Sequence, residues 1–144
     1  MAGGDDFVEI TGLVRDLYAA LVTGDRETVT RLVADDFVGD LTESLPFGIG
    51  GLHHGREAMI DGGWWAVGRA YSMRIEPTEW IGCTDGRLLV LGRYRGRARA
   101  TGGRVDAAFA HVWTARDGRL TAVWQLTDSV RWLAALEGPA PGDA

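Results

Sequence analysis

The chain of 144 residues has the length of a single domain and is long enough to bury a real core. Its hydrophobic fraction of 46% and charged fraction of 24% are typical of a globular protein. The net charge of −5 argues against nucleic acid as a partner, because phosphate binding needs a basic face.

The sequence has no feature that predicts a membrane protein. No apolar run approaches the ~20 residues needed to cross a bilayer. The acidic start, Met1 to Asp6, lacks the basic and apolar regions of a signal peptide. We therefore expect a cytoplasmic protein with one domain over residues 1–144 and flexible ends at 1–6 and 137–144.

Two helices are predicted near the start of the chain. The first has an apolar stripe at the spacing of one helix face, and Gly24 ends it. The stripe consists of Ile10, Leu13, Val14, Leu17, Tyr18 and Leu21. Asp25 suits the N-cap of a shorter second helix, which Asp35-Asp36 closes. A short strand is expected from Phe37 to Leu41.

A glycine-rich loop and a third helix follow. Residues 42–55 contain Pro46 and several glycines and predict a loop. The third helix starts near Arg56. Gly62-Gly63 inside it costs about 1 kcal/mol per glycine relative to alanine, so we expect a kink or an early end there.

From Tyr71 onward the pattern predicts strands joined by hairpin turns that contain glycine. The expected strands are Tyr71–Glu76, Thr78–Cys83, Arg87–Thr101, Arg104–Ala115 and Arg119–Asp128. Ser129 to Leu136 is expected to form a terminal helical turn. Helices followed by a meander of antiparallel strands predict an α+β fold, with a space between the helices and the curved sheet.

Five short motifs occur in an order that is characteristic of one superfamily. They are Leu17-Tyr-Ala-Ala-Leu-Val-Thr-Gly-Asp25, Leu32-Val-Ala-Asp-Asp36, Gly55-Arg-Glu-Ala58, Arg116-Asp-Gly-Arg-Leu120 and Trp124-x-x-x-Asp128. Over roughly residues 8 to 133 the chain resembles the NTF2-like proteins, most closely the SnoaL-like polyketide cyclases and ketosteroid-isomerase-like enzymes. The resemblance implies a cone-shaped barrel in which N-terminal helices pack on a curved antiparallel sheet.

The catalytic residues of that superfamily carry over only in part. The ketosteroid isomerase positions match Leu41, Leu17 and Ala110, while Tyr18, Asp40 and His111 lie one residue away, which disfavours that mechanism. Of the Asp–Arg–Asp set of the epoxide hydrolases, Arg93 and Asp128 match, but Arg95 stands where the other aspartate belongs. The acid–base aspartate that the SnoaL-like branch places in the last strand matches Asp128.

Asp128 is the first candidate catalytic residue. It follows Trp124 by four residues, so both side chains point to the same side of the strand. A carboxylate beside an indole on an apolar face suits a general acid or base. The alternative is that Asp128 caps the terminal helix.

The position of His111 depends on the register of the last hairpin. If Asp117-Gly118 forms a two-residue turn, Arg116 faces Arg119 and His111 faces Trp124. Phe109, His111, Trp124 and Asp128 then share the inner face. With a loop one residue longer, the inner set would be Asp106, Ala108, Ala110 and Asp128 instead. Asp-Gly favours the first register, and a core histidine bonded to the backbone is the alternative to a catalytic one.

The other pocket candidates are aromatic or polar. Trp64, Trp65 and Trp124 could flank a flat apolar ligand, and Tyr18 and Asp40 could line its cavity. His54 could lie at the mouth, although a solvated loop histidine is the simpler reading. Adjacent His53 and His54 face opposite ways and lack a third ligand, so no metal site is expected.

Arg93, Arg95, Arg97 and Arg99 alternate and place four cations on one face of a strand. Such a row is usually a solvated face or a dimer interface, and anion recognition is a minority reading. Cys83 is the single cysteine, which excludes an intrachain disulfide.

These residues and the resemblance lead to one hypothesis about function. The chain is expected to bind a small, apolar, carbonyl-bearing ligand and to catalyse its cyclisation or isomerisation without a cofactor, with Asp128 and His111 as the catalytic pair. A homodimer is expected. The alternatives are an epoxide-opening enzyme, with Arg93 polarising the epoxide, and a non-catalytic ligand-binding or dimer-scaffold protein.

Overall fold

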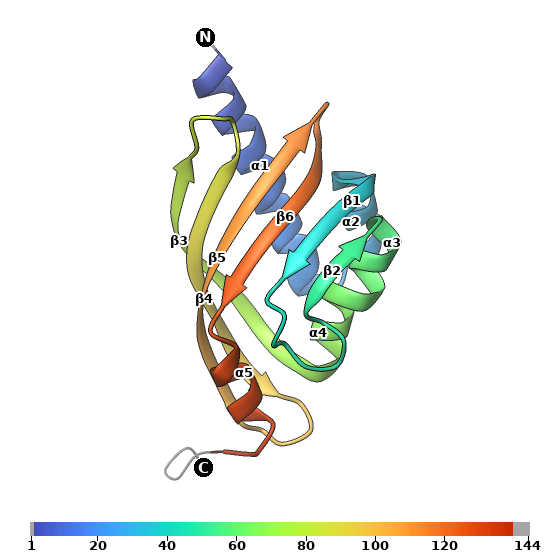
Figure 1. Ribbon diagram of the computed structural model, residues 1–144, viewed down its shortest axis with the longest axis vertical. Helices are drawn as coiled ribbons and strands as arrows, with labels where there is room; N and C mark the ends of the chain where they lie inside the picture. The colour runs from blue at the N-terminus through green and yellow to red at the C-terminus, as the bar shows by residue number, and fades with distance from the viewer. Residues whose placement is uncertain (1, 140–144) are drawn as a thin grey trace.

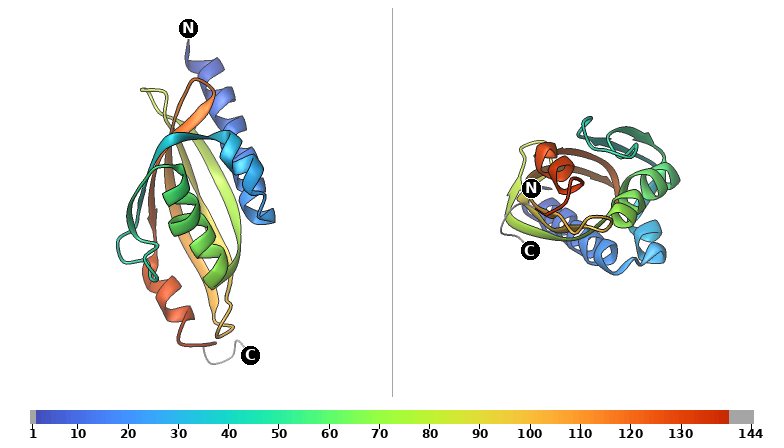
Figure 2. Two further views of the ribbon diagram at one scale, coloured as in Figure 1. Left: turned by 90° about the vertical axis from the view of Figure 1, so that its right-hand side faces the viewer. Right: turned by 90° about the horizontal axis from the view of Figure 1, so that it is seen from below.

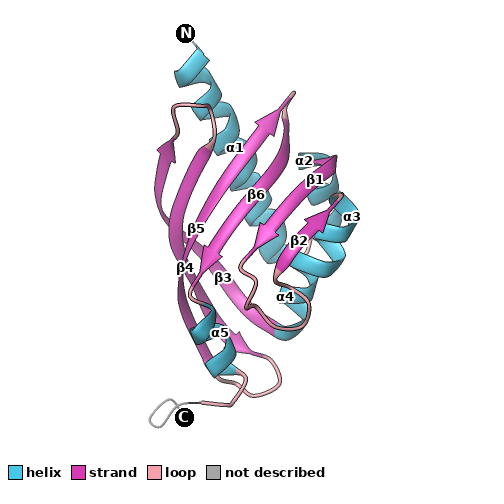
Figure 3. Ribbon diagram, viewed as in Figure 1, coloured by secondary structure: helices cyan, strands magenta, loops and turns pink. Residues whose placement is uncertain are grey.

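The computed structural model describes residues 2–139, which form a curved six-stranded sheet with helices packed against it (Figures 1 and 3). The strands are β1 (Val33–Leu41), β2 (Gly51–His54), β3 (Tyr71–Gly82), β4 (Leu88–Ala98), β5 (Arg104–Arg116) and β6 (Arg119–Thr127). The α-helices are α1 (Ala2–Thr23), α2 (Arg26–Leu32), α3 (Arg56–Met59), α4 (Trp65–Ala70) and α5 (Ser129–Ala135). A π-helical turn, Ile60–Trp64, joins α3 to α4.

The α+β prediction is confirmed, with two refinements. The strand order is β2-β1-β6-β5-β4-β3, and β1 pairs with β6 in parallel, so the sheet is mixed rather than antiparallel. Strands β2 and β3 are its two edges, so the sheet curls without closing into a barrel. Figure 2 shows α1 and the α3–α4 segment on one side of the sheet, and α5 at one end. None of the described helices is long and apolar enough to cross a membrane.

The first two helices form for the predicted reasons. In α1, Val14 and Leu17 are fully buried and Tyr18 is buried beside them. In α2, the Oδ1 atom of Asp25 accepts a hydrogen bond from the backbone N–H of Thr28 at 3.1 Å, as an N-cap does. However, α2 ends at Leu32, because Val33 is already extended. The first strand therefore starts four residues earlier than predicted.

The segment between β1 and β3 departs most from the expected elements. The predicted loop contains β2, which pairs antiparallel with β1. The glycine pair does not end the third helix: Gly62 and Gly63 lie in the π-helical turn, and the helix resumes as α4. Gly63 is needed for a close approach, since a Cβ there would lie 2.8 Å from the terminal methyl carbon of Met59.

The predicted pair of short strands after Tyr71 is one strand, β3, with an irregularity in its pairing to β4 between Pro77 and Glu79. Proline cannot donate to a ladder, so a break in register at this point is expected.

The last hairpin decides which side chains face the helices. The two-residue turn is confirmed, since Arg116 pairs with Arg119. A β-bulge then leaves Thr121 without a partner and shifts the register by one residue. His111 therefore lies opposite Gln125, and the prediction that it faces Trp124 is wrong.

The inner face of β6 consists of Val123, Gln125 and Thr127, which are buried, while Trp124 and Leu126 are exposed on the outer face. A single inserted residue thus exchanges the two faces of β6 relative to the prediction.

The close contact of β3 and β4 is testable through Gly96. A Cβ atom on Gly96 would lie 1.9 Å from the carbonyl oxygen of Ser72, which is backbone and cannot move aside cheaply. We expect Gly96→Ala to lower the free energy of unfolding by about 3 kcal/mol, measured by chemical denaturation. The matched control, Gly12→Ala in α1, meets nothing within 4 Å and should stabilise by up to about 1 kcal/mol. An unchanged midpoint for Gly96→Ala would contradict the close strand contact.

Candidate functional site

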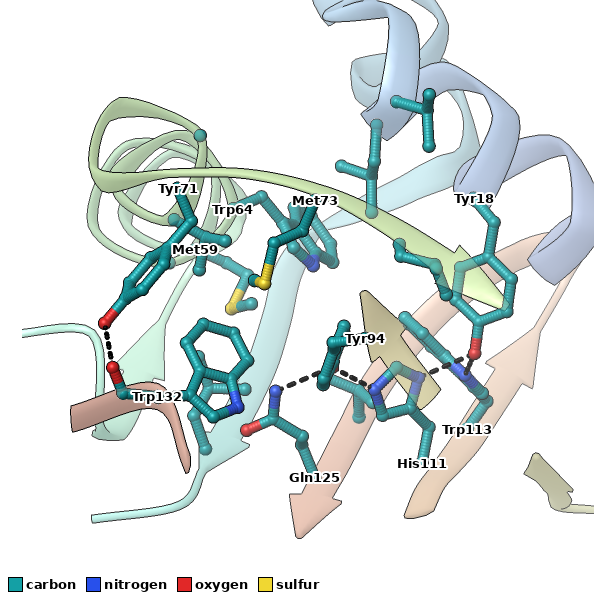
Figure 4. Close-up of a pocket in the computed structure, with 18 residues that line it drawn as sticks. Tyr18, Met59, Trp64, Tyr71, Met73, Tyr94, His111, Trp113, Gln125 and Trp132 are labelled. Carbon is teal, nitrogen blue, oxygen red and sulfur yellow. Dashed lines mark hydrogen bonds between the residues drawn. The ribbon is translucent and has the colours of Figure 1, made fainter. Parts of the chain in front are cut away.

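A pocket of about 110 Å³ lies between the sheet and the helices, lined by eighteen residues from both layers (Figure 4). We call it the His111 pocket. The lining residues are Tyr18, Leu21, Val22, Leu41, Met59, Gly63, Trp64, Val67, Gly68, Tyr71, Met73, Ile75, Tyr94, His111, Trp113, Val123, Gln125 and Trp132. None of these is an acid, a lysine or an arginine, so the pocket is apolar with a few neutral polar groups.

The polar groups form one hydrogen-bonded network centred on His111 (Figure 4). The ring Nδ1 atom lies 2.6 Å from the Tyr18 hydroxyl, and the Nε2 atom is bonded to the Tyr94 hydroxyl. Each phenol oxygen also accepts a hydrogen bond from a neighbouring side chain. Trp113 Nε1–H donates to Tyr18 at 3.1 Å, and the Gln125 amide N–H donates to Tyr94 at 2.8 Å.

The orientation of Gln125 is set by the segment after β1. Its Oε1 atom accepts from the backbone N–H of Thr42 at 3.3 Å, which directs its NH₂ group to Tyr94. The Thr42 hydroxyl in turn donates to the Gln125 carbonyl and accepts from the Thr127 N–H. The network is therefore held from four elements, α1, β4, β5 and β6, and from the segment that follows β1.

The network contains two hydroxyl protons but only one acceptor nitrogen to receive them. A neutral imidazole has one N–H donor and one acceptor nitrogen, whereas Tyr18 and Tyr94 each carry a hydroxyl proton. Only one phenol can donate to the acceptor nitrogen, and the other must accept from the ring N–H. That other hydroxyl proton has no acceptor among residues 2–139. One phenol is thus available as a donor to a bound molecule.

Burial keeps all three groups neutral. Loss of hydration lowers the pKa of His111 from 6.5 to about 3. The same cause raises the pKa of the Tyr18 and Tyr94 phenols well above their usual value of 10. Near neutral pH the pocket therefore presents hydrogen-bond donors and acceptors but no ion.

The fold and this pocket can be compared with known proteins. A family model described as the SnoaL-like domain matches residues 14–123, most of the chain. The chain belongs to the SnoaL-like family. Comparison with curated protein sequences gave no match.

Solved structures agree with this assignment of the SnoaL-like fold. An NTF2-like protein of unknown function from Burkholderia pseudomallei is 27% identical with a TM-score of 0.78, covering 88% of this chain and 96% of the other. TerC, co-crystallised with polyporic acid, is 25% identical with a TM-score of 0.78, covering 90% and 99%. IdmH from Streptomyces antibioticus, a proposed polyketide cyclase, is 23% identical with a TM-score of 0.72, covering 88% and 97%.

Of the side chains predicted for this SnoaL-like site, Tyr18, Trp64 and His111 line the pocket. Phe109 is buried behind them and stacks on the His111 ring, with centroids 4.0 Å apart and an interplanar angle of 17°. Trp65 lies outside the pocket, where Arg26 approaches its ring.

The prediction that Asp128 and Trp124 face the pocket is wrong, because the bulge at Thr121 turns both outward. Trp124 is 44% exposed. Asp128 is the exposed N-cap residue of α5, as its alternative reading proposed, but its carboxylate makes no hydrogen bond to a helix amide. It pairs instead with the side chain of Arg131 at 3.1 Å.

The predicted places of Asp40, Arg93 and His54 in the pocket are also wrong. Asp40 alternates with the buried Gly39 and Leu41 and so faces away from the helices. Arg93 lies on the outer face and pairs with Asp106 at 2.6 Å. His54 is exposed on the edge strand β2.

Sequence reasoning missed Tyr94, Gln125, Trp113 and Trp132 as parts of the site. A signal for Tyr94 was present: if the arginine row marks the outer face of β4, the alternating tyrosine must face inward. Gln125 had no such signal, because its direction depends on the bulge. Trp132 reaches the pocket from α5 and donates from its Nε1 atom to Thr127 at 3.1 Å.

The buried, neutral His111 predicts a pH-dependent stability. Below pH 6.5 the unfolded chain binds a proton on this histidine that the folded chain, with a pKa of about 3, does not. Stability should therefore fall by about 1.4 kcal/mol per pH unit as the pH drops from 6.5 towards 5.

His111→Gln removes this contribution, while the other titrating groups remain the same in both proteins. Between pH 7 and pH 5 we expect the wild type to lose about 2 kcal/mol more unfolding free energy than the variant, measured in urea. Equal losses in the two proteins would contradict a neutral, buried His111.

Proposed function

We propose that this SnoaL-like chain binds a small, apolar, carbonyl-bearing, polyketide-like molecule in the His111 pocket and catalyses its cyclisation or isomerisation without a cofactor. The observation that supports this most is the surplus hydroxyl proton of the Tyr18–His111–Tyr94 network at an apolar cavity. A carbonyl oxygen is the neutral acceptor that completes the network.

The pocket suits the body of such a ligand. Aromatic and thioether side chains, among them Trp64, Trp113 and Met73, supply flat, adaptable walls. A cavity of about 110 Å³ has room for one small ring, so a larger ligand must extend through the mouth. The exposed Val22 and Gly68 mark that mouth, between the end of α1 and α4.

The network provides acid–base chemistry without forming an ion. In one direction, Tyr18 gives its proton to the ligand oxygen and takes the Nδ1 proton of His111. At the same time, Tyr94 gives its proton to Nε2 and takes a proton from a ligand carbon. Protons balance, no group becomes charged, and the ligand has become its enol. In the return step Tyr94 gives a proton to a different ligand carbon and Tyr18 takes the enol proton, which completes the isomerisation and restores the starting tautomer of His111.

Neutrality is what makes this relay preferable to an ionic base. Ionising any of the three groups in the pocket costs several kcal/mol, as their shifted pKa values indicate. A concerted shift avoids that cost. The same hydrogen bonds polarise a bound carbonyl, which lowers the barrier for a cyclisation in which negative charge develops on oxygen.

The second candidate function is ligand binding without turnover. The absence of a carboxylate from the residues that line the pocket favours it. The epoxide-opening reading has lost its support, because Arg93 and Asp128 lie outside the pocket.

A small probe separates the two candidates. We expect the wild type to accelerate conversion of 3-cyclohexen-1-one into its conjugated isomer, followed by ultraviolet absorbance. Tyr18→Phe and Tyr94→Phe should each lower the rate about 100-fold, because each breaks the relay. Asp128→Asn, outside the pocket, should leave the rate unchanged.

Loss of turnover in Asp128→Asn would contradict the relay and restore the aspartate mechanism. Binding of polyporic acid, measured by tryptophan quenching, together with no turnover would favour the binding function. If the wild type shows no binding of polyporic acid and no turnover of the probe, the proposal is overturned.

We also propose that the chain forms a homodimer through the outer face of β1, β2 and β6. Leu52, Asp40 and Trp124 are cross-strand neighbours there, and Leu126 follows on the same face. Leu52 is 61% exposed and Leu126 53% exposed. Apolar side chains gathered on one sheet face are typical of an interface.

Analytical ultracentrifugation tests this assembly. Trp124→Glu should weaken self-association at least tenfold, since it removes the large apolar side chain and places a second carboxylate beside Asp40. Val130→Glu on α5, a side chain that is 72% exposed, is the matched control and should not. A wild type that sediments as a monomer would contradict the dimer.

A further inference from the structure

We propose that a second hollow, at the mouth of the His111 pocket, binds a carboxylate of the same ligand. The substrate is then amphipathic, with an apolar, carbonyl-bearing body and an anionic end. The inference rests on the proposed function only in taking the His111 pocket as the place of the ligand's body.

The hollow adjoins the pocket, because six residues line both. It has a volume of about 420 Å³ and shares Leu21, Val22, Trp64, Gly68, Tyr71 and Met73 with the pocket lining. Beyond these shared residues it is lined by Thr23, Gly24, Trp65, Arg69, Ser72 and Arg99. We call it the outer hollow. A ligand too long for the inner cavity extends into this space.

Two arginines from separate segments meet at the outer hollow. Arg69 belongs to α4, and its Nη2 atom donates to the carbonyl of Asp61 at 3.0 Å. Arg99 follows β4, and its Nε atom donates to the carbonyl of Gly68 at 2.8 Å. The Arg99 backbone N–H also donates to Ala70 at 2.9 Å. Each guanidinium has five N–H donors, so one anchoring bond positions it and leaves donors for a ligand.

No acid of the described residues forms an ion pair with either of these two cations. Neither Arg69 nor Arg99 has a carboxylate within 4.0 Å among residues 2–139, and no acid lines the outer hollow. Asp61 is the acid next to Arg69, and Arg26 binds its carboxylate at 2.9 Å. By contrast, Arg93 and Arg95, which belong to the same arginine row as Arg99, both pair with Asp106.

A third hollow, at the far end of the sheet, shows that this is not a general property of the surface. It also contains arginines, Arg87 and Arg116, but Asp6, Glu9, Asp85 and Asp117 line it with them. The outer hollow, next to the apolar pocket, is therefore lined by two arginines and no acid, although the chain as a whole has a net charge of −5.

The two compartments require opposite ligand chemistry. The inner pocket offers neutral donors and would exclude an ion. The outer hollow offers two guanidinium groups, and a guanidinium can bind a planar carboxylate with two parallel hydrogen bonds. A ligand with a ketone at one end and a carboxylate at the other satisfies both compartments in one orientation only.

Matched probes test the outer hollow. We would measure by calorimetry the binding of 4-acetylbenzoate, 6-acetyl-2-naphthoate and 4′-acetylbiphenyl-4-carboxylate, each beside its methyl ester. For at least one length, the carboxylate should bind about tenfold more tightly than its ester, and the preference should shrink as sodium chloride rises from about 0.05 M to about 0.5 M.

Arg69→Gln/Arg99→Gln should reduce this preference to about twofold or less and leave ester binding unchanged. Arg97→Gln is the matched control, because Arg97 lies in the same row, binds the Gly102 carbonyl and does not line the hollow. It should keep the wild-type preference.

Two results would overturn the inference: esters that bind as tightly as the carboxylates in the wild type, or a preference that survives in the double variant. Failure of the proposed function looks different, since then the esters, which carry the apolar body without the anionic end, would not bind.

Discussion

The pairing of both ring nitrogens of one buried imidazole is the constraint on which the site depends. His111 is 5% exposed and surrounded by aromatic side chains, and a polar group in such a place must be hydrogen-bonded. Its partners come from different layers: Tyr18 from the first helix and Tyr94 from the sheet. The bonds therefore join helix to sheet at the inner end of the cavity. They also leave one hydroxyl proton for a ligand, so the same constraint that organises the core defines the chemistry.

The parts of this arrangement that depend on local sequence could be predicted. The stripe of α1 and the Asp25 cap follow from neighbours within one or two turns, and Asp117-Gly118 specifies its two-residue turn. The bulge at Thr121 could not be predicted, because neither glycine nor proline marks it and the apolar residues Leu120, Ala122, Trp124 and Leu126 lie at the spacing of one regular strand face. That one insertion turned Trp124 and Asp128 outward and brought Gln125 in.

Other differences arise from pairing between distant segments. The parallel partner of β1 is β6, more than 80 residues later, and no local pattern encodes that choice. Strand β2 is four residues long and lies in a glycine-rich segment, so composition predicted a loop. In both cases the pairing within the sheet determines the local structure, because a backbone that lies beside a strand edge gains hydrogen bonds whatever its intrinsic propensity. Tyr94 differs, since the arginine row on the opposite face of β4 already implied its direction.

The distribution of charge sets the direction in which a ligand can enter. The inner pocket holds no ion, and burial shifts the pKa values of His111 and the two phenols so that none forms there. The arginines beside the mouth are exposed, so a carboxylate bound to them keeps part of its hydration. A ligand with one neutral and one charged end therefore loses least free energy when its carbonyl points towards His111 and its charge points to solvent. Reversing it would bury an uncompensated charge among aromatic rings. Orientation thus follows from desolvation, and the hydrogen bonds of the network need only place the carbonyl that desolvation has already directed inward.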